Sequence, residues 1–277
     1  MNVGNNCYMN AILQSISLFP ALYTQRPPQS NLLKELALIM EKLNSSQPNQ
    51  PRRINPKPFL VQLEKTIWRY EHEPQFKRNQ QQDVREVIST LLEEVNSQLT
   101  KPTIQDIKTC LHCHNIITTT RTPNFLILPV KDTVTDMLAT YTEVEPLELL
   151  NCPGCNMATA ATQRTTILEP PEILVAIINR ESPGGRRINT AIKDVGQFNL
   201  HTDANIDLLY STRAVIHHHG SRTTGNQERG HYTANIKKGD YWMRCDDSLV
   251  SETTANKAGS DTAYIFLTKD YVKTRRP

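Results

Sequence analysis

The first third of the chain is patterned for helices. After Cys7, apolar residues recur at helical spacing from Ile12 to Phe19 and stop at Pro20, which predicts a helix with the cysteine at its start. Three more runs of the same period predict three further helices, built on Leu32, Leu36, Ile39 and Leu43, on Phe59, Leu63, Ile67 and Tyr70, and on Val84, Ile88, Leu91, Val95 and Leu99. The proline- and asparagine-rich stretch between two of these runs, SSQPNQPRRINPKP, predicts a surface loop.

From about Lys108 the pattern changes to strands. The β-branched and apolar runs are NIITTTRTP, FLILPV and ILVAIINR, each bounded by proline or by a cysteine pair. Near the end, HYTANI, a KKGD turn and YWMRCDD predict a hairpin, and AYIFL predicts one more strand. Helices followed by strands indicate an α+β protein in which a helical lobe faces a sheet lobe across a cleft.

Composition excludes several classes of protein. The chain has 277 residues, 38% of them apolar and 21% charged, and no stretch is apolar and long enough to cross a bilayer. Its net charge of +3 is not clustered, which argues against a nucleic-acid surface. No secretory signal pattern opens the sequence, so we expect reduced thiols and a cytosolic or nuclear protein without a membrane partner.

Four of the six cysteines form two CxxC pairs, CLHC with Cys110 and Cys113, and CPGC with Cys152 and Cys155. Four thiolates complete a closed tetrahedral site and leave no open position for catalysis, so the pattern predicts structural zinc. A disulfide or a redox motif is the competing interpretation of CPGC, but a second pair in a reducing compartment disfavours it. Two nearby histidines, at 112 and 114, are close enough in sequence to replace a cysteine ligand.

Cys7 stands apart from these pairs. A thiol at a helix N-terminus meets the helix dipole and unpaired backbone N–H groups, both of which favour the thiolate. An isolated cysteine is otherwise often a small buried apolar residue. The surrounding sequence, NVGNNCYMNAILQSI, resembles the cysteine box of the ubiquitin-specific proteases, with Asn6 where threonine is usual, and this implies that Cys7 is a nucleophile.

A second resemblance lies far along the chain. The segment GHYTANIKKGDYWMRCDDSLV is similar to the histidine box of the same family. It implies that His231 is the general base, that Asp246 orients its imidazole and that Asp247 is an adjacent carboxylate. An imidazole paired with a thiol stabilises the thiolate, and a carboxylate behind it fixes the tautomer of the ring.

The family resemblance gives roles to further residues. It implies that Asn2 supplies a side-chain amide to the oxyanion, together with backbone N–H groups. It places His217, His218 and His219 on a strand before a loop, GSRTTGNQERG, that closes over the ubiquitin tail, with Gly230 as the hinge. Without the resemblance, the three histidines are equally consistent with exposed strand residues or a chance metal-binding run.

A third segment, QQDVREVISTLLEEV, resembles the family's box of Gln-Gln-Asp and a helix. It implies that Asp83 meets an arginine in the C-terminal tail of ubiquitin. Helix capping by Asp83 is the structural alternative, and the two roles are compatible. Tyr232, next to the base, is expected to line the tail channel, although an aromatic residue in a sheet is more often part of the core.

The likeness runs in order from Asn2 to about Asp270. It implies one catalytic domain with a papain-like fold, divided into a helical thumb (about 1–107), zinc-bearing fingers (about 108–165) and a palm (about 166–277). The implied activity is hydrolysis of the bond between the terminal glycine of ubiquitin and a lysine side chain, through a thioester, by a monomer without an organic cofactor.

Three other functions stay open at this stage. One is a protease for another ubiquitin-like modifier, which the active-site boxes do not distinguish. Another is a catalytically silent ubiquitin-binding scaffold, which is disfavoured because suitable residues occupy the positions of the nucleophile, the base and the orienting acid. The last is a zinc-dependent nucleic-acid-binding protein, which the unclustered charge opposes. Cys245, the remaining cysteine, is predicted to be a buried neutral thiol.

Overall fold

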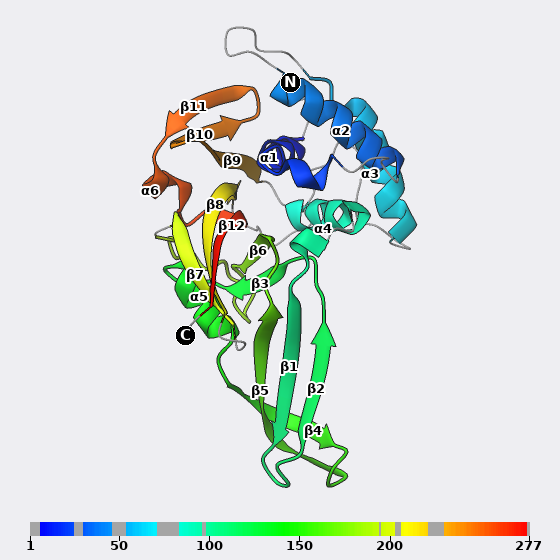
Figure 1. Cartoon of the computed structure of the whole chain (residues 1–277), viewed down its shortest axis with the longest axis vertical. Helices are drawn as coiled ribbons and strands as arrows, with labels where there is room; N and C mark the ends of the chain where they lie inside the picture. Colours follow the sequence, from blue (N-terminus) through cyan, green and yellow to red (C-terminus); the bar gives the residue numbers. More distant parts are fainter. Residues whose placement is uncertain are drawn as a thin grey trace.

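A helical lobe, a long narrow sheet and a second, broader sheet make up the molecule (Figure 1). The computed structural model describes residues 6–24, 30–45, 54–70, 83–95, 98–193, 195–202, 206–220 and 230–275. Within these ranges, no helix combines the length and the apolar character that a bilayer crossing needs.

The four predicted helices are confirmed. They are α1 (Cys7–Ile16), α2 (Asn31–Asn44), α3 (Lys57–Tyr70) and α4 (Val84–Val95), with short 3-10 turns η1 (Pro20–Leu22) and η2 (Gln98–Thr100). Ser30 caps α2, because its hydroxyl accepts a hydrogen bond of 3.3 Å from the backbone N–H of Leu33. The buried faces of all four helices belong to one apolar cluster, which begins at Cys7 itself.

The narrow sheet carries the two cysteine pairs. Its strands are β1 (Thr103–Cys110), β2 (Ile116–Arg121), β4 (Glu145–Cys152) and β5 (Met157–Glu169), in the antiparallel order β2-β1-β5-β4. It extends away from the rest of the molecule (Figure 1). Its own apolar cluster contains only Cys110, Leu150, Cys152 and Ala161 as buried members, so the sheet has little core of its own.

The broad sheet has eight strands in the order β11-β10-β9-β8-β12-β6-β3, with β7 paired to β8. Their bounds are β3 (Leu126–Pro129), β6 (Ile173–Asn179), β7 (Gln197–His201), β8 (Ile206–His219), β9 (His231–Lys238), β10 (Tyr241–Asp246), β11 (Leu249–Thr253) and β12 (Ala263–Arg275). Short helices α5 (Val134–Tyr141) and α6 (Ala255–Ala258) complete it. All pairings are antiparallel except β3 with β6.

Alternate residues of the broad sheet enter two separate cores. In β6, Ile173, Val175 and Ile177 pack with the helices α1–α4, whereas Leu174, Ala176 and Ile178 pack on the opposite side with α5 and β7. This division follows from the two-residue period of a strand. It fixes α1, and therefore Cys7, against one face of the sheet.

Several boundaries differ from the prediction. The first strand begins at Thr103, before the expected change at Lys108. The range 108–165, expected to form the fingers, also contains β3 and α5, which pack on the broad sheet. The reason is that β3 pairs in parallel with β6, and such a non-local pairing leaves no local signal in the sequence.

The strand β11 and the helix α5 are among the elements that were not predicted. β11 lies between the expected hairpin and the last strand, and four of its five residues are exposed, so it shows no apolar alternation. α5 was missed although its start carries a capping signal, since the hydroxyl of Thr133 accepts a 3.1 Å hydrogen bond from the backbone N–H of Asp136.

Candidate active site

Cys7 is the first residue of α1 and is 5% exposed. Burial raises the pKa of its thiol, and the charge of Asp247 adds to that rise. Hydrogen bonds from the backbone N–H groups of Tyr232, Tyr8 and Cys7 itself act in the opposite direction. Backbone N–H groups of β9 and of the helix start thus favour the thiolate, but burial outweighs them and leaves the pKa of the thiol raised.

His231 and Asp246 form a hydrogen-bonded pair at the ends of neighbouring strands. His231 is the first residue of β9, Asp246 is the last residue of β10, and the ring Nε2 lies 2.6 Å from Oδ1. Partial burial acts to raise the pKa of Asp246, but its hydrogen bonds and charge interactions with His231 and Arg244 prevail and leave that pKa lowered. Asp246 thus stays ionised beside the imidazole.

The thiol and the imidazole are neighbours through the backbone. Tyr232, whose N–H reaches the Cys7 sulfur, directly follows His231. In the part of the chain that the structure describes, no hydrogen bond joins the thiol to the ring of His231. Because Nε2 is bound to Asp246, Nδ1 is the nitrogen that is left to accept a proton from the thiol.

Asp247 links this pair of strands to the helix of the cysteine. Its Oδ1 accepts a hydrogen bond of 2.7 Å from Asn10 Nδ2, one turn along α1 from Cys7. Asp247 lies in the turn between β10 and β11 with a φ of 52°, a conformation that aspartate tolerates better than most residues. The predicted adjacent carboxylate is therefore a contact between the sheet and α1.

Two other predicted residues have different outcomes. Asn2 lies outside the described residues. Gly230 is described, and a Cβ atom at this position would lie 2.2 Å from Nε2 of His218. Close approach of the His218 ring is thus the observable reason for glycine here, and its role as a hinge stays a prediction.

The three consecutive histidines lie at the end of β8, opposite the start of β9. His217 is 3% exposed, so the interpretation as an exposed residue is wrong for it. Its Nε2 accepts a hydrogen bond of 2.9 Å from Asn235, and its Nδ1 lies 3.1 Å from the hydroxyl of Thr262. Burial lowers the pKa of His217 to about 3, which keeps the ring neutral.

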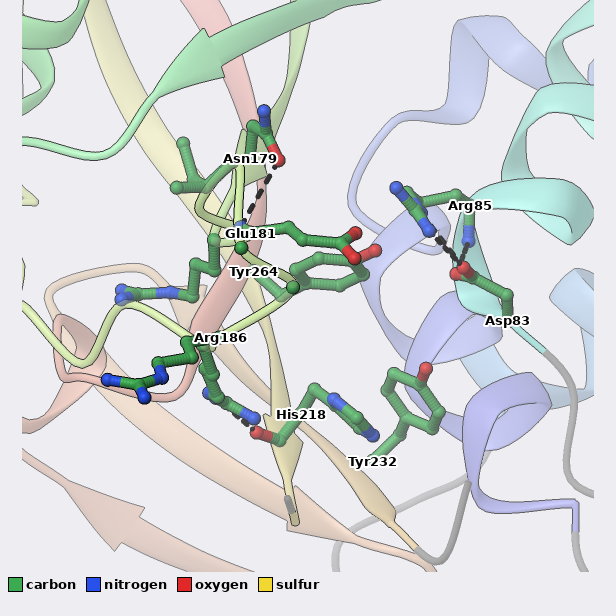
Figure 2. Close-up of a pocket in the computed structure, with 13 residues that line it drawn as sticks. Asp83, Arg85, Asn179, Glu181, Arg186, His218, Tyr232 and Tyr264 are labelled. Carbon is green, nitrogen blue, oxygen red and sulfur yellow. Dashed lines mark hydrogen bonds and ion pairs between the residues drawn. The ribbon is translucent and has the colours of Figure 1, made fainter. Parts of the chain in front are cut away.

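A pocket of about 470 Å³ opens beside Tyr232, the residue that follows His231 (Figure 2). Its walls come from the start of α4, the turn that follows β6, and the strands β8, β9 and β12. The lining residues are Asp83, Arg85, Ile178, Asn179, Arg180, Glu181, Gly184, Gly185, Arg186, Arg187, His218, Tyr232 and Tyr264. Tyr232 joins the pocket to Cys7.

Tyr232 is both a core residue and a lining residue of this pocket. It is 2% exposed, belongs to the cluster that contains α1, and stacks on His218 with ring centroids 4.6 Å apart. Burial lowers the pKa of His218 to about 4, so the stacked imidazole is neutral. The two interpretations that the sequence left open for Tyr232 are compatible.

Asp83 caps α4, as one of its two predicted roles requires. Its Oδ1 accepts a hydrogen bond of 2.8 Å from the backbone N–H of Arg85. Its Oδ2 accepts two more, from Arg85 Nε at 2.9 Å and from Nη2 at 2.6 Å. The guanidinium carbon of Arg85 also lies 5.7 Å from the ring centroid of Tyr264. Arg85 was not predicted to belong to the site; the signal that points to it is its position two residues after the acid.

Two arginines that the sequence analysis missed hold the far wall of the pocket. Arg180 donates hydrogen bonds to the backbone carbonyls of Ala263, Ile188, Thr190 and Ser260. Burial lowers the pKa of Arg180 to about 10. Arg187 donates to the carbonyl of His218 in β8 and to that of Gly220, the residue that follows β8 by one position. Both guanidinium groups are therefore committed to the backbone.

The four cysteines of the two CxxC pairs meet at the end of the narrow sheet. Their sulfur atoms all lie within 4.8 Å of one another, and the Sγ atoms of Cys113 and Cys152 are 3.6 Å apart. Each pair forms a similar turn. The backbone N–H of His114 donates a hydrogen bond to the carbonyl of Cys110, and that of Asn156 donates one to the carbonyl of Cys152. The cluster among the described residues contains these cysteines and neither nearby histidine. Four such thiols can hold a metal ion.

Cys245 lies in β10 between Ala234 of β9 and Val250 of β11. It is 4% exposed, and burial raises the pKa of its thiol to about 11. The prediction of a buried neutral thiol is confirmed.

Comparisons with known proteins identify relatives of the whole chain. The family model described as ubiquitin carboxyl-terminal hydrolase matches residues 1–267. The chain is 23% identical to ubiquitin carboxyl-terminal hydrolase 22 of Bos taurus, with 99% of this chain and 67% of the relative covered. It is 26% identical to ubiquitin carboxyl-terminal hydrolase 4 of Arabidopsis thaliana, with 90% of this chain and 83% of the relative covered. It spans 64% of the length of ubiquitin carboxyl-terminal hydrolase 22 of Homo sapiens.

Solved structures share the fold. The SAGA DUB module bound to ubiquitin aldehyde matches with a TM-score of 0.75 at 20% identity, over 99% of this chain and 69% of that one. The same module bound to monoubiquitin matches with a TM-score of 0.74 at 20% identity, with coverage of 99% and 69%. The predicted α+β fold is confirmed, with helical thumb, palm sheet and a fingers sheet that carries the clustered cysteines.

Proposed function

Because this chain belongs to the ubiquitin carboxyl-terminal hydrolase family, a family of cysteine-type deubiquitinating enzymes, we propose that it removes ubiquitin from the lysine side chains of other proteins. The bond to be hydrolysed joins the terminal glycine of ubiquitin to the lysine amine. The observation that carries the proposal is the convergence of Cys7, His231 and Asp246 where α1 packs on β9 and β10.

Cys7 is the proposed nucleophile and His231 its base. Because burial holds the pKa of the Cys7 thiol above its usual range, the reactive thiolate depends on His231 to take the proton at Nδ1. The sulfur then attacks the carbonyl carbon of the terminal glycine. The carbon–nitrogen bond breaks, and the imidazolium returns its proton to the leaving lysine amine.

Water completes the reaction. His231 takes a proton from a water molecule as the water oxygen attacks the thioester carbonyl. The carbon–sulfur bond breaks, and the imidazolium returns that proton to the departing sulfur, which restores the thiol. The other water proton passes to solvent and leaves the ubiquitin carboxylate. Throughout both steps Asp246 holds the ring by Nε2 and stabilises its charged form, as the 2.6 Å hydrogen bond supports. Backbone N–H groups at the start of α1, with the side chain of Asn2, are the proposed donors to the oxyanion.

The pocket beside Tyr232 is the proposed channel for the extended tail of ubiquitin. Its volume of about 470 Å³ and its continuity with Cys7 through Tyr232 support this assignment. Asp83 and Tyr232 then form part of the channel, and Gly230 lies next to the ring of His218 in its wall. The neutral ring of His218, stacked on the buried ring of Tyr232, offers a flat wall, which suits an extended chain with small residues at its end.

Zinc is the metal that we propose for the cysteine cluster. Four sulfur atoms within 4.8 Å of one another match the closed tetrahedral geometry of structural zinc. When bound, zinc would cross-link the turns of the two CxxC pairs and would take no part in catalysis. Because the fingers sheet has a buried apolar cluster of only four residues, such a cross-link has a clear structural purpose.

A cleavage assay tests the proposed function. Ubiquitin joined through its C-terminus to a lysine that carries a fluorescent group is the substrate, and Cys7→Ala and His231→Ala are the variants. We expect release of the lysine by the native chain and no release by either variant. Thermal unfolding of the variants controls for the fold.

A second ubiquitin-like modifier, linked in the same way, identifies the substrate. Cleavage of ubiquitin alone supports the proposal in full. Cleavage of only the second modifier would keep the chemistry and refute the substrate. No cleavage of either substrate by a folded protein would contradict the proposal.

A further inference from the structure

The pocket has carboxylates on two opposite walls. Of the described residues that line it, Asp83 and Glu181 are the acids. Asp83 belongs to the start of α4, and Glu181 to the turn that follows β6. Figure 2 shows the Glu181 side chain extended toward the ring of Tyr264 and toward the side of Arg85, into the space between the walls.

Asp83 is occupied by its own chain. A carboxylate offers about four lone-pair positions, and Arg85 fills three of those of Asp83, including both on Oδ2. A second guanidinium can therefore not bind Asp83 through two parallel hydrogen bonds unless Arg85 leaves. The position of Arg85 beside the ring of Tyr264, with 5.7 Å from guanidinium carbon to centroid, holds it in place.

The other cations of the pocket do not face its centre. Arg180 and Arg187 direct their guanidinium groups to backbone carbonyls. Arg186 points away from Tyr264 and Arg85 (Figure 2). The charged groups that face one another across the open space are thus Glu181 on one wall and the pair of Asp83 with Arg85 on the other.

We infer that Arg85 and Glu181 determine charge specificity in this pocket: Arg85 occupies Asp83, and Glu181 is the carboxylate that meets a basic side chain of the substrate tail. This inference rests on the proposed function, because it takes the pocket as the channel for the ubiquitin tail. The family resemblance implies that Asp83 recognises a tail arginine; the inference assigns this recognition to Glu181 on the opposite wall instead.

Binding measurements between variants of both partners test the inference. Each arginine in the tail of ubiquitin is replaced in turn by glutamine, and the dissociation constant is measured against the Cys7→Ala protein and against Cys7→Ala with Glu181→Gln. We expect each single change at the paired positions to weaken binding about 3- to 10-fold, as for a partly exposed charged hydrogen bond. The two changes together should cost little more than either one, because they remove the same interaction.

Three enzyme variants sharpen the test. Glu172→Gln is the matched control, since Glu172 lies outside the pocket in an exposed ion pair with Lys269. Asp83→Asn should show no coupling to the tail arginines while Arg85 is present. Arg85→Ala keeps the backbone N–H that Asp83 caps and frees Oδ2, so in this background coupling between Asp83 and a tail arginine should appear.

Two results would overturn the inference. Coupling of a tail arginine to Asp83 with Arg85 in place, and none to Glu181, would return the recognition to Asp83. The effects of Glu181→Gln and of a tail-arginine change on binding could also simply add, as those of Glu172→Gln should. That result would show that Glu181 does not meet the tail. With either result, cleavage of ubiquitin by the native chain would leave the proposed function intact. Absence of any binding to ubiquitin would refute the proposed function and the inference together.

Discussion

Asp247 in the turn after β10 accepts a 2.7 Å hydrogen bond from Asn10, which lies one turn along the helix that begins at Cys7. This contact joins the element that carries the nucleophile to the hairpin that carries His231 and Asp246. The same carboxylate raises the pKa of the Cys7 thiol through its charge. One residue therefore aligns the two halves of the site and at the same time disfavours the thiolate.

Replacement of Asp247 by asparagine should separate these two effects. Asparagine keeps an oxygen for the hydrogen bond from Asn10 and removes the charge, so the pKa of the Cys7 thiol should fall. The rate of alkylation of Cys7 by iodoacetamide rises with pH as the thiolate forms, and in Asp247→Asn this rise should move to lower pH. Asp240→Asn, in the exposed turn between β9 and β10, is the control. An unchanged alkylation profile in Asp247→Asn would contradict the charge effect.

The His231–Asp246 pair predicts a pH-dependent stability. The pKa of Asp246 is lowered in the folded protein, so its ionisation contributes stability above the usual carboxyl range. That contribution is lost as the pH falls through the lowered value. The melting temperature of the native chain should exceed that of Asp246→Asn at neutral pH, and the difference should vanish in acid. A difference that stays constant over this range would contradict the assignment.

Gly230 and His218 offer a test of close packing next to the base. A Cβ at Gly230 would meet His218 Nε2 at 2.2 Å, so Gly230→Ala should destabilise the fold by about 1–3 kcal/mol, as overpacking does. In His218→Ala the space is open, and the added cost of Gly230→Ala should be small. Denaturant unfolding of the two single variants and the double variant measures this coupling. Additive effects would show that the His218 ring is not the obstacle.

Much of the candidate site could be predicted because each of its separate segments carries its own local pattern. The helix at Cys7, the hairpin from His231 to Asp246 and the cap at Asp83 depend on local patterns, and the structure shows all of them. The roles of Cys7, His231, Asp246 and Asn2 stay proposals, as does location in the cytosol or nucleus.

What the sequence did not reveal depends on contacts between distant segments. The polar ring of His217 can be buried because Asn235 in β9 and Thr262, the residue before β12, hydrogen-bond its two nitrogens. The far wall of the pocket depends on Arg180 reaching carbonyls up to 83 positions away. No period or motif records such contacts, since they arise only when the strands are assembled.

Metal removal should affect binding before chemistry. The fingers sheet has few buried residues, so loss of a metal from the four-cysteine cluster should lower its stability. We expect one zinc per chain by elemental analysis, a lower melting temperature after chelation and a KM for a ubiquitin substrate that rises more than kcat falls. Cys113→Ser should reproduce these effects, whereas Cys245→Ala, outside the cluster, should retain the metal. A metal-free protein with unchanged melting temperature and KM would contradict the proposed zinc site.

The most direct test of the central claim is the covalent capture of Cys7. The native chain, Cys7→Ala and His231→Ala are incubated with ubiquitin that carries a thiol-reactive group at its C-terminus, and the products are mapped by mass spectrometry. The account predicts one adduct, on Cys7, which is absent in Cys7→Ala and forms much more slowly in His231→Ala. An adduct on another cysteine, or none on a folded native chain, would contradict it.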